Sequence, residues 1–350
     1  MRRPDPLPTI DEIRALLRED GIGHVGVATA DVLSVARRAL HERREAGLHA
    51  DMGFTYRNPD RSTDPARAVP GARSVIVAAR SYLTDDDPLR PAGPQARVGR
   101  YAWTDHYAPL RRALRSVCTR IRRADERAVA FADDNSIVDR AVAHRAGLGW
   151  YGKNANLLLP GAGSWFVLGC IVTTADYAPD PGPVADGCGT CVRCIEACPT
   201  GAIVAPGVID AGRCLSWILQ RPGTIPLEYR VAIGDRIYGC DDCQDACPIS
   251  VRLGRRETIP LDGEAGAWVD ALALLDADDA WIEQRCGHWY VAGREVRWLR
   301  RNALVILGNV GDPADRCVRD VLDRYRAGID PILADHASWA LARLDERAHS

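Results

Sequence analysis

The sequence contains a single lysine, Lys153, although Lys and Arg together number 45 in 350 residues. We ascribe this preference for arginine to compositional bias, so most arginines need no specific role. The chain also lacks an apolar run of about 18 residues, which a transmembrane helix requires, and no charged-then-apolar leader opens it. The net charge of −2 argues against a general nucleic-acid coat, although local basic faces are compatible with it. These absences favour a cytoplasmic enzyme with no membrane partner.

Length and composition predict a globular protein of two or three domains, because 47% of the residues are apolar and 26% are charged. Strand-like and helical patterns alternate in the first half, which indicates an α/β or α+β layer. Loop-rich sequence follows, and the last part is helical throughout, in a pattern typical of HEAT-like repeats. We therefore expect domains at 1–180, 181–255 and 256–350. The predicted helices cover 9–20, 110–123, 138–147, 295–314 and 337–348, and the predicted strands cover 21–30, 74–83 and 164–174.

Eight of the twelve cysteines lie between residues 188 and 247, and we expect the other four, Cys118, Cys170, Cys286 and Cys317, to be buried thiols. The run CGTCVRCIEACP has the spacing of bacterial ferredoxins, in which the fourth cysteine ligates the other cluster. A second run, CDDCQDACP, lacks the middle cysteine, and one cysteine stands alone between the runs. Zinc sites need separated pairs, which fit less well. We predict two [4Fe-4S] clusters, one on Cys188, Cys191, Cys194 and Cys247, the other on Cys198, Cys214, Cys240 and Cys243.

The two-cluster segment is a small part of the chain, so the remainder either docks redox partners or houses a site where electrons are used. The segment at 131–169, FADDNSIVDRAVAHRAGLGWYGKNANLLLPGAGSWFVLG, precedes the cysteines. Together with CGTCVRCIEACPTGAI, IYGCDDCQDACP and RRNALVILGN, it resembles the epoxyqueuosine reductases, from about residue 10 to 345. That resemblance implies a cobalamin-binding α/β domain, two four-iron clusters and C-terminal helical repeats. It implies reduction of the epoxide of epoxyqueuosine to queuosine at the wobble position of tRNA, the last step of queuosine synthesis.

The resemblance also implies roles for particular residues. Asp133, in the family's F-x-D motif, corresponds to the proton donor. The adjacent Asp134 competes with it, because this chain has Asp134 where the family usually has a small residue and Ser136 where it usually has a proline. We expect Gly149 and Gly152 to let the backbone approach the corrin, and His106 is either a buried histidine or a cofactor contact. The residues that correspond to cobalamin contacts are Arg57, Asp133, Lys153, Leu157, Leu168, Cys240 and Asp241.

Binding of tRNA requires a basic surface for its phosphates. At 3.6 residues per turn, Arg294, Arg297 and Arg301 would share one face of a helix and form a strip for phosphates. We expect a flavodoxin or ferredoxin-type reductant and a monomer. Two alternatives stay open: a reductive dehalogenase-like enzyme with the same cofactors, and a non-catalytic ferredoxin-type electron carrier.

Overall fold

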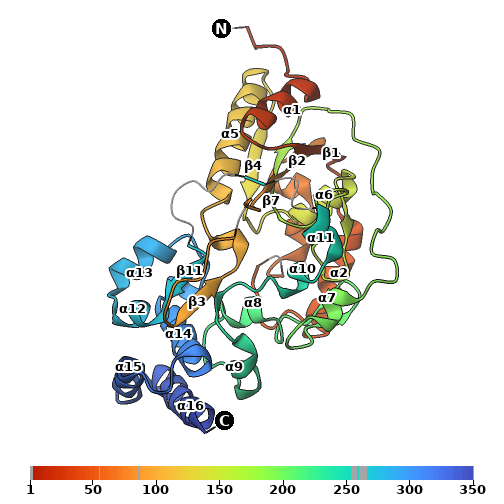
Figure 1. The fold of residues 1–350 in the computed structure, drawn as a ribbon. Helices are drawn as coiled ribbons and strands as arrows, with labels where there is room; N and C mark the ends of the chain where they lie inside the picture. The colour runs from red at the N-terminus through yellow and green to blue at the C-terminus, as the bar shows by residue number, and fades with distance from the viewer. Residues whose placement is uncertain (1–2, 55, 86, 254–257, 260–265, 350) are drawn as a thin grey trace.

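The computed structural model describes residues 3–54, 56–85, 87–253, 258–259 and 266–349, with the two termini at opposite ends of the molecule (Figure 1). The domain boundary predicted at 255/256 lies outside the described residues. No helix in these ranges has both the length and the apolarity needed to cross a membrane.

The N-terminal half is built on a four-stranded antiparallel sheet of order β1-β2-β7-β4. All three strands and the three helices predicted here from periodicity are present, which confirms the mixed α/β class. The elements of this half are α1 (Ile10–Glu19), β1 (His24–Thr29), α2 (Ser34–Glu45), α3 (Pro59–Ser62), α4 (Pro65–Ala68), β2 (Ser74–Ser81), α5 (Tyr107–Arg123), β4 (Ala128–Ala132), α6 (Asp139–Arg145), β5 (Trp150–Tyr151), β6 (Leu157–Leu158) and β7 (Phe166–Thr173).

Alternation along the strands gives the sheet two apolar faces. In β7, Ile171 points to the face covered by α1 and α5, while Leu168 points to the face covered by α6 and the β5–β6 hairpin. Helix α1 begins at a capping box, in which Thr9 and Glu12 satisfy each other's backbone amides. The second face is the one that reaches the functional site.

The cysteine segment consists of short elements joined by loops, with 187–250 lying beside the second face of the sheet (Figure 1). Gln244 ties it to the sheet, because its side-chain amide donates to the Tyr82 hydroxyl at 3.0 Å and to Ser164 Oγ at 3.1 Å. The elements are α7 (Arg193–Glu196), β8 (Ile203–Ala205), β9 (Val208–Ile209), α8 (Leu215–Ile218), α9 (Leu227–Ile233), β10 (Arg236–Tyr238), α10 (Asp242–Asp245) and α11 (Pro248–Leu253).

The C-terminal part is helical, as predicted, and packs on the rest of the chain. Helix α14 is buried on nearly all sides because α12, α16 and β10 surround it. At Gly308 a Cβ atom would lie 2.8 Å from the Cα of Ala340, so glycine permits the close approach of α14 and α16. The elements are β11 (Trp268–Asp270), α12 (Ala271–Asp276), α13 (Asp279–Cys286), η3 (Ala292–Arg294), α14 (Arg297–Val310), α15 (Arg316–Arg326) and α16 (Pro331–Ala348).

The predicted contiguous domains need one correction. Strand β3 (Gln95–Val98) and the turn η1 (Arg100–Ala102) leave the N-terminal layer and enter a second sheet of order β10-β3-β11. Ala96, Val98 and Trp103 belong to the same apolar core as the C-terminal helices. Sequence order could not indicate this, because the partners of β3 lie about 140 and 170 residues further along the chain.

Candidate active site

A cavity of about 1530 Å³ opens between the sheet, the cysteine segment and the first part of the helical region. Small-molecule pockets are commonly about 300–1,000 Å³, so this one is large enough for a cofactor and a substrate group together. Its walls combine apolar side chains from β6 and β7 with polar groups from loops of all three regions.

The eight clustered cysteines form two groups of four. One group surrounds a second cavity of about 160 Å³ and comprises Cys188, Cys191, Cys194 and Cys247. The other group lines the large cavity and comprises Cys198, Cys214, Cys240 and Cys243. In the described residues no three His, Cys, Asp or Glu converge on a single ion, whereas a cubane holds its four thiolates farther apart.

The thiols of the second group are in a desolvated setting. Burial raises the pKa of Cys214, and it raises the pKa of Cys240 to about 12. A buried thiolate needs positive charge beside it, which a cubane's iron supplies. The donor set, its grouping and its desolvation therefore fit two [4Fe-4S] clusters. Of the four scattered cysteines, Cys118, Cys170 and Cys286 are buried as predicted, whereas Cys317 is exposed on α15, which corrects that prediction.

Asp133 follows β4 directly and lines the large cavity. Its φ of +54° lies in the left-handed region, which is uncommon for a non-glycine residue and costs energy. Desolvation raises the pKa of its carboxyl, while the positive charges of Arg111 and Arg294 act in the opposite direction. A carboxyl with a raised pKa can hold a proton closer to neutral pH.

Asp134 also lines the cavity, but its carboxylate is engaged locally. Its Oδ1 accepts the backbone N–H of Ser136 at 2.7 Å, which closes the turn that enters α6. No hydrogen bond to the Asp133 carboxyl occurs among the described residues. The geometry therefore favours Asp133 over Asp134 as the group available to a substrate.

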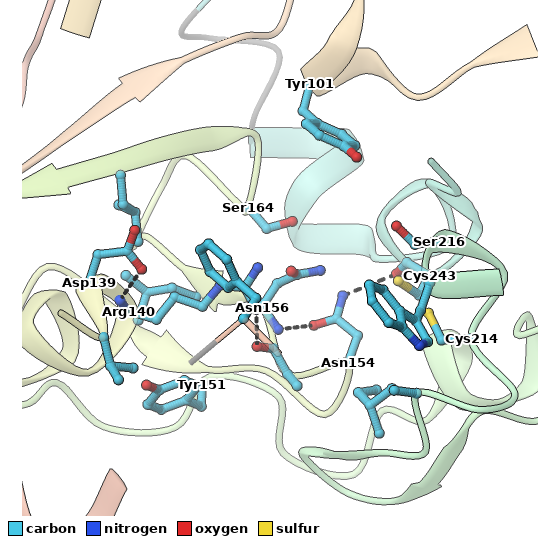
Figure 2. Close-up of a pocket in the computed structure, with 18 of the residues that line it drawn as sticks. Tyr101, Asp139, Arg140, Tyr151, Asn154, Asn156, Ser164, Cys214, Ser216 and Cys243 are labelled. Carbon is cyan, nitrogen blue, oxygen red and sulfur yellow. Dashed lines mark hydrogen bonds between the residues drawn. The ribbon is translucent and has the colours of Figure 1, made fainter. Parts of the chain in front are cut away.

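Sequence reasoning missed a third carboxyl, Asp139, at the start of α6 (Figure 2). It lines the cavity, accepts the N–H of Arg140 at 2.6 Å, and burial raises its pKa to about 6. Tyr107 faces the same acids, and burial raises the pKa of its hydroxyl, as do the charges of Asp139 and Asp133. The sequence held a signal for Asp139, an acid on the helix after the F-x-D motif, but only the fold turns it toward the cavity.

His106 is a buried histidine, as the first of its two interpretations predicted, and its contact with a cofactor stays a prediction. It is buried, contacts the Tyr82 ring and lies within hydrogen-bonding distance of Thr104 Oγ1, and it also lines the cavity. Burial lowers its pKa to about 4, with the charge of Arg80 acting in the same direction. His106 is therefore a neutral group of the wall near neutral pH.

Most residues predicted to contact cobalamin line the large cavity. Leu157 and Leu168 are buried in its apolar wall, and Cys240 and Asp241 lie opposite. Asp241 accepts the N–H of Arg100 at 2.7 Å, and burial raises its pKa to about 6. Lys153 also lines the cavity, with its ammonium 2.7 Å from the carbonyl oxygen of Gly189.

Two further predictions concern this wall. Arg57 is exposed and is not part of the cavity lining, to which its neighbours Met52, Phe54 and Tyr56 contribute, so its contact with cobalamin stays a prediction. The glycines serve the hairpin: a Cβ on Gly149 would lie 2.2 Å from the Leu158 carbonyl oxygen, and one on Gly152 would lie 2.1 Å from Leu158 Cδ1. Close packing of β5 on β6 therefore requires both glycines, and Gly152 also lines the cavity.

The predicted basic strip does not form. Arg301 is fully buried, and its guanidinium donates to the carbonyls of residues 218, 219, 221 and 223, at the end of α8 and just beyond it. Arg294 precedes α14, has a φ of +60°, and lines the cavity rim. Arg297 is half-buried and pairs with Asp330 at 2.9 Å. The helix-face argument failed because α14 begins only at Arg297 and is enclosed by its neighbours.

These features define a two-cluster iron–sulfur oxidoreductase whose second set of thiols faces a cofactor-sized cavity. Residues 187–250 match the family model of a 4Fe-4S double cluster binding domain, and residues 62–134 match that of epoxyqueuosine reductase QueG, DUF1730. An epoxyqueuosine reductase of Xanthomonas campestris pv. campestris is 34% identical over 366 residues, 98% of each chain. The chain belongs to the epoxyqueuosine reductase family.

Solved structures agree. An epoxyqueuosine reductase bound to an epoxyqueuosine-modified tRNA-Tyr stem loop superposes with a TM-score of 0.88 at 28% identity, covering 97% of this chain and 91% of that one. In a Bacillus subtilis epoxyqueuosine reductase, with a TM-score of 0.84 at 27% identity and 96% and 90% coverage, a catalytic aspartate loop is swung out of the active site. The activity is thus epoxyqueuosine reduction, and the family model that matches residues 187–250 shows a domain for two [4Fe-4S] clusters. This family membership decides against the dehalogenase-like and pure electron-carrier alternatives.

Proposed function

We propose that this chain reduces the epoxide of epoxyqueuosine at the wobble position of tRNA, which yields queuosine. The observation that carries the proposal is that Asp133 and the cysteine group of Cys198, Cys214, Cys240 and Cys243 line one cavity of about 1530 Å³. A proton donor and an electron source thereby face the same space. Conversion of an epoxide to an alkene consumes two electrons and two protons and releases the oxygen as water.

We assign the first cluster to Cys188, Cys191, Cys194 and Cys247, and the second to Cys198, Cys214, Cys240 and Cys243. The support is that each set lines a cavity of its own. The second cluster would then border the large cavity, where its electrons are used, while the loop of the first carries the exposed Cys191. A flavodoxin or ferredoxin-type reductant would deliver electrons at that exposed loop.

We assign cobalamin to the large cavity, held between the wall of Leu157 and Leu168 and the turn at Cys240 and Asp241. When bound, cobalamin supplies a low-valent cobalt centre that can attack or trap a ring carbon. The protein's part is to bury that chemistry and to position a proton. The Asp241 carboxylate already accepts the Arg100 N–H, so that the turn is fixed before any cofactor arrives.

Asp133 is the proton donor in this proposal. Its carboxyl is not engaged by a neighbour's hydrogen bond in the described structure, and desolvation raises its pKa. The left-handed conformation at this residue suits a loop that moves, as does the aspartate loop swung out in the Bacillus subtilis enzyme. Asp139, deeper in the wall, is a second protonated carboxyl at mildly acidic pH.

The tRNA would approach across the part of the cavity lining that comprises His288, Trp289, Tyr290 and Arg294, here called the rim. Tyr290 is half-exposed there and Arg294 is exposed, so one offers a surface for base stacking and the other a positive charge. The C-terminal helices, as HEAT-like repeats, would support the anticodon arm of a tRNA bound by a monomer in the cytoplasm.

The test is anaerobic reconstitution with iron, sulfide and cobalamin, followed by nucleoside analysis of tRNA that carries epoxyqueuosine. We expect the corrinoid spectrum in the protein, and queuosine in the tRNA after addition of a low-potential reductant. Bound clusters with no corrinoid and no queuosine would favour the electron-carrier alternative. A matched reaction with Asp133→Asn protein separates enzymatic turnover from free cobalamin chemistry.

A further inference from the structure

The only lysine and the asparagine beside it reach both cysteine groups. They lie in the turn between β5 and β6, and both side chains line both cavities. Lys153 Nζ donates to the carbonyl oxygen of Gly189 at 2.7 Å, between the first two cysteines of the first group. Asn154 Nδ2 donates to the carbonyl oxygen of Cys243 at 3.3 Å, in the second group (Figure 2).

The turn that carries these two side chains is held by its own backbone. The Gly152 N–H donates to the Asn156 carbonyl at 2.8 Å, and the Asn156 N–H donates to Asn154 Oδ1 at 3.2 Å. The Lys153 carbonyl accepts the Gly207 N–H at 2.9 Å from the loop after β8. Asn154 is 5% exposed, with both ends of its amide engaged. The two donors are therefore presented at fixed positions.

We propose that Lys153 and Asn154 are positioning residues that hold the two cysteine loops at a fixed separation and raise the reduction potentials of their clusters. Reduction adds negative charge to a cluster, so a nearby ammonium favours the reduced form. Donors that fix a ligand's backbone act on the cluster as outer-shell partners do at other metal sites. A compact ammonium can lie against a single carbonyl, where arginine's planar fork would present several donors.

This inference rests on the cysteine assignments proposed above but not on the tRNA reaction. In this proposal the β5–β6 hairpin connects the sheet to both clusters. The charge of Lys153 acts on the first cluster, and the amide of Asn154 acts on the second. Each side chain therefore has its own measurable target.

The test is an anaerobic redox titration, followed by EPR, of holoprotein that contains both clusters. We expect Lys153→Gln to lower the potential of the first cluster by up to about 59 mV, which is a tenfold change in the reduced-to-oxidised ratio for one electron. The potential of the second cluster should change by less. Asn154→Leu should lower the second potential and spare the first. Lys153→Arg, which keeps the charge, should stay closer to the wild type than Lys153→Gln.

The matched control is Arg18→Gln, which removes the same charge from an exposed position on α1, at the other end of the sheet from α7 (Figure 1). The inference is overturned if Lys153→Gln and Arg18→Gln have the same two potentials at full iron content. Loss of one cluster in Lys153→Gln but not in Lys153→Arg would support it. Wild-type protein that binds no iron would instead refute the proposed function, and iron analysis distinguishes the two failures.

Discussion

The cysteine segment and the wall of the large cavity meet at one site but are built in opposite ways. The ligands of the segment are near neighbours in sequence, so their spacing alone indicates what they bind. The wall draws Asp133 from the end of a strand, Asp139 from a helix, Asp241 from a cysteine loop and Arg294 from the C-terminal region. Chemistry that depends on spacing is local, whereas chemistry that depends on a shared cavity needs the whole fold.

The largest effect should come from the wall. We expect Asp133→Asn to reduce turnover by about 10²–10⁴-fold, because an amide cannot deliver the proton that the departing oxygen needs. Cluster content and the corrinoid spectrum should match the wild type. Single-turnover analysis of queuosine in tRNA, with both spectra recorded on the same sample, measures this.

Asp134→Asn is the matched control, since its amide oxygen can still accept the Ser136 N–H. It should retain most of the activity. The reverse pattern, an active Asp133→Asn and an inactive Asp134→Asn, would assign the proton to the other aspartate.

The next largest effect concerns the contact between the cysteine segment and the C-terminal helices. Arg301 lies on α14 but donates to backbone carbonyls at the end of α8 and just beyond it, and α8 begins beside Cys214. Arg301→Met would leave several buried carbonyls without donors, at about 1–3 kcal/mol each before relaxation. We expect the free energy of unfolding to fall by about 3–5 kcal/mol, measured by denaturant titration of the holoprotein.

Arg297→Met is the comparison for that variant. Its pair with Asp330 is about one-third exposed, so its loss should cost about 1 kcal/mol or less. If Arg301→Met weakened tRNA binding without loss of stability, Arg301 would be a surface contact and the burial argument would fail.

The difference between local spacing and a shared cavity also explains which features could be predicted from the sequence. Periodicity predicted α1, α5 and β7, and cysteine spacing predicted two groups of four. The transfer of β3 into a second sheet, the burial of Arg301 and the turn of Asp139 toward the cavity all depend on contacts between distant segments. Asp133 was found through family resemblance, because a lone acid before a helix is more often a cap.

Gly149→Ala separates packing from cofactor binding. The added methyl group would meet the Leu158 carbonyl, and overpacking of this kind costs about 1–3 kcal/mol. We expect the loss in unfolding free energy to be present without cobalamin, with Gly23→Ala as a control because its Cβ would have open space. A loss of cobalamin affinity at unchanged stability would instead show that Gly149 lets the backbone approach the corrin.

The smallest predicted effect tests whether the rim acts on the wall. Asp133 must be protonated to act, so turnover should fall as pH rises through its pKa, which desolvation raises and the charge of Arg294 lowers. Arg294→Gln removes that opposing charge, so the falling limb of kcat should move to higher pH by about 1 unit or less. Arg297→Gln should leave the profile in place, because the Arg297 charge is paired with Asp330. A shift to lower pH, or equal profiles for the two variants, would show that Arg294 does not act on the carboxyl and that the cavity wall is electrostatically independent of its rim.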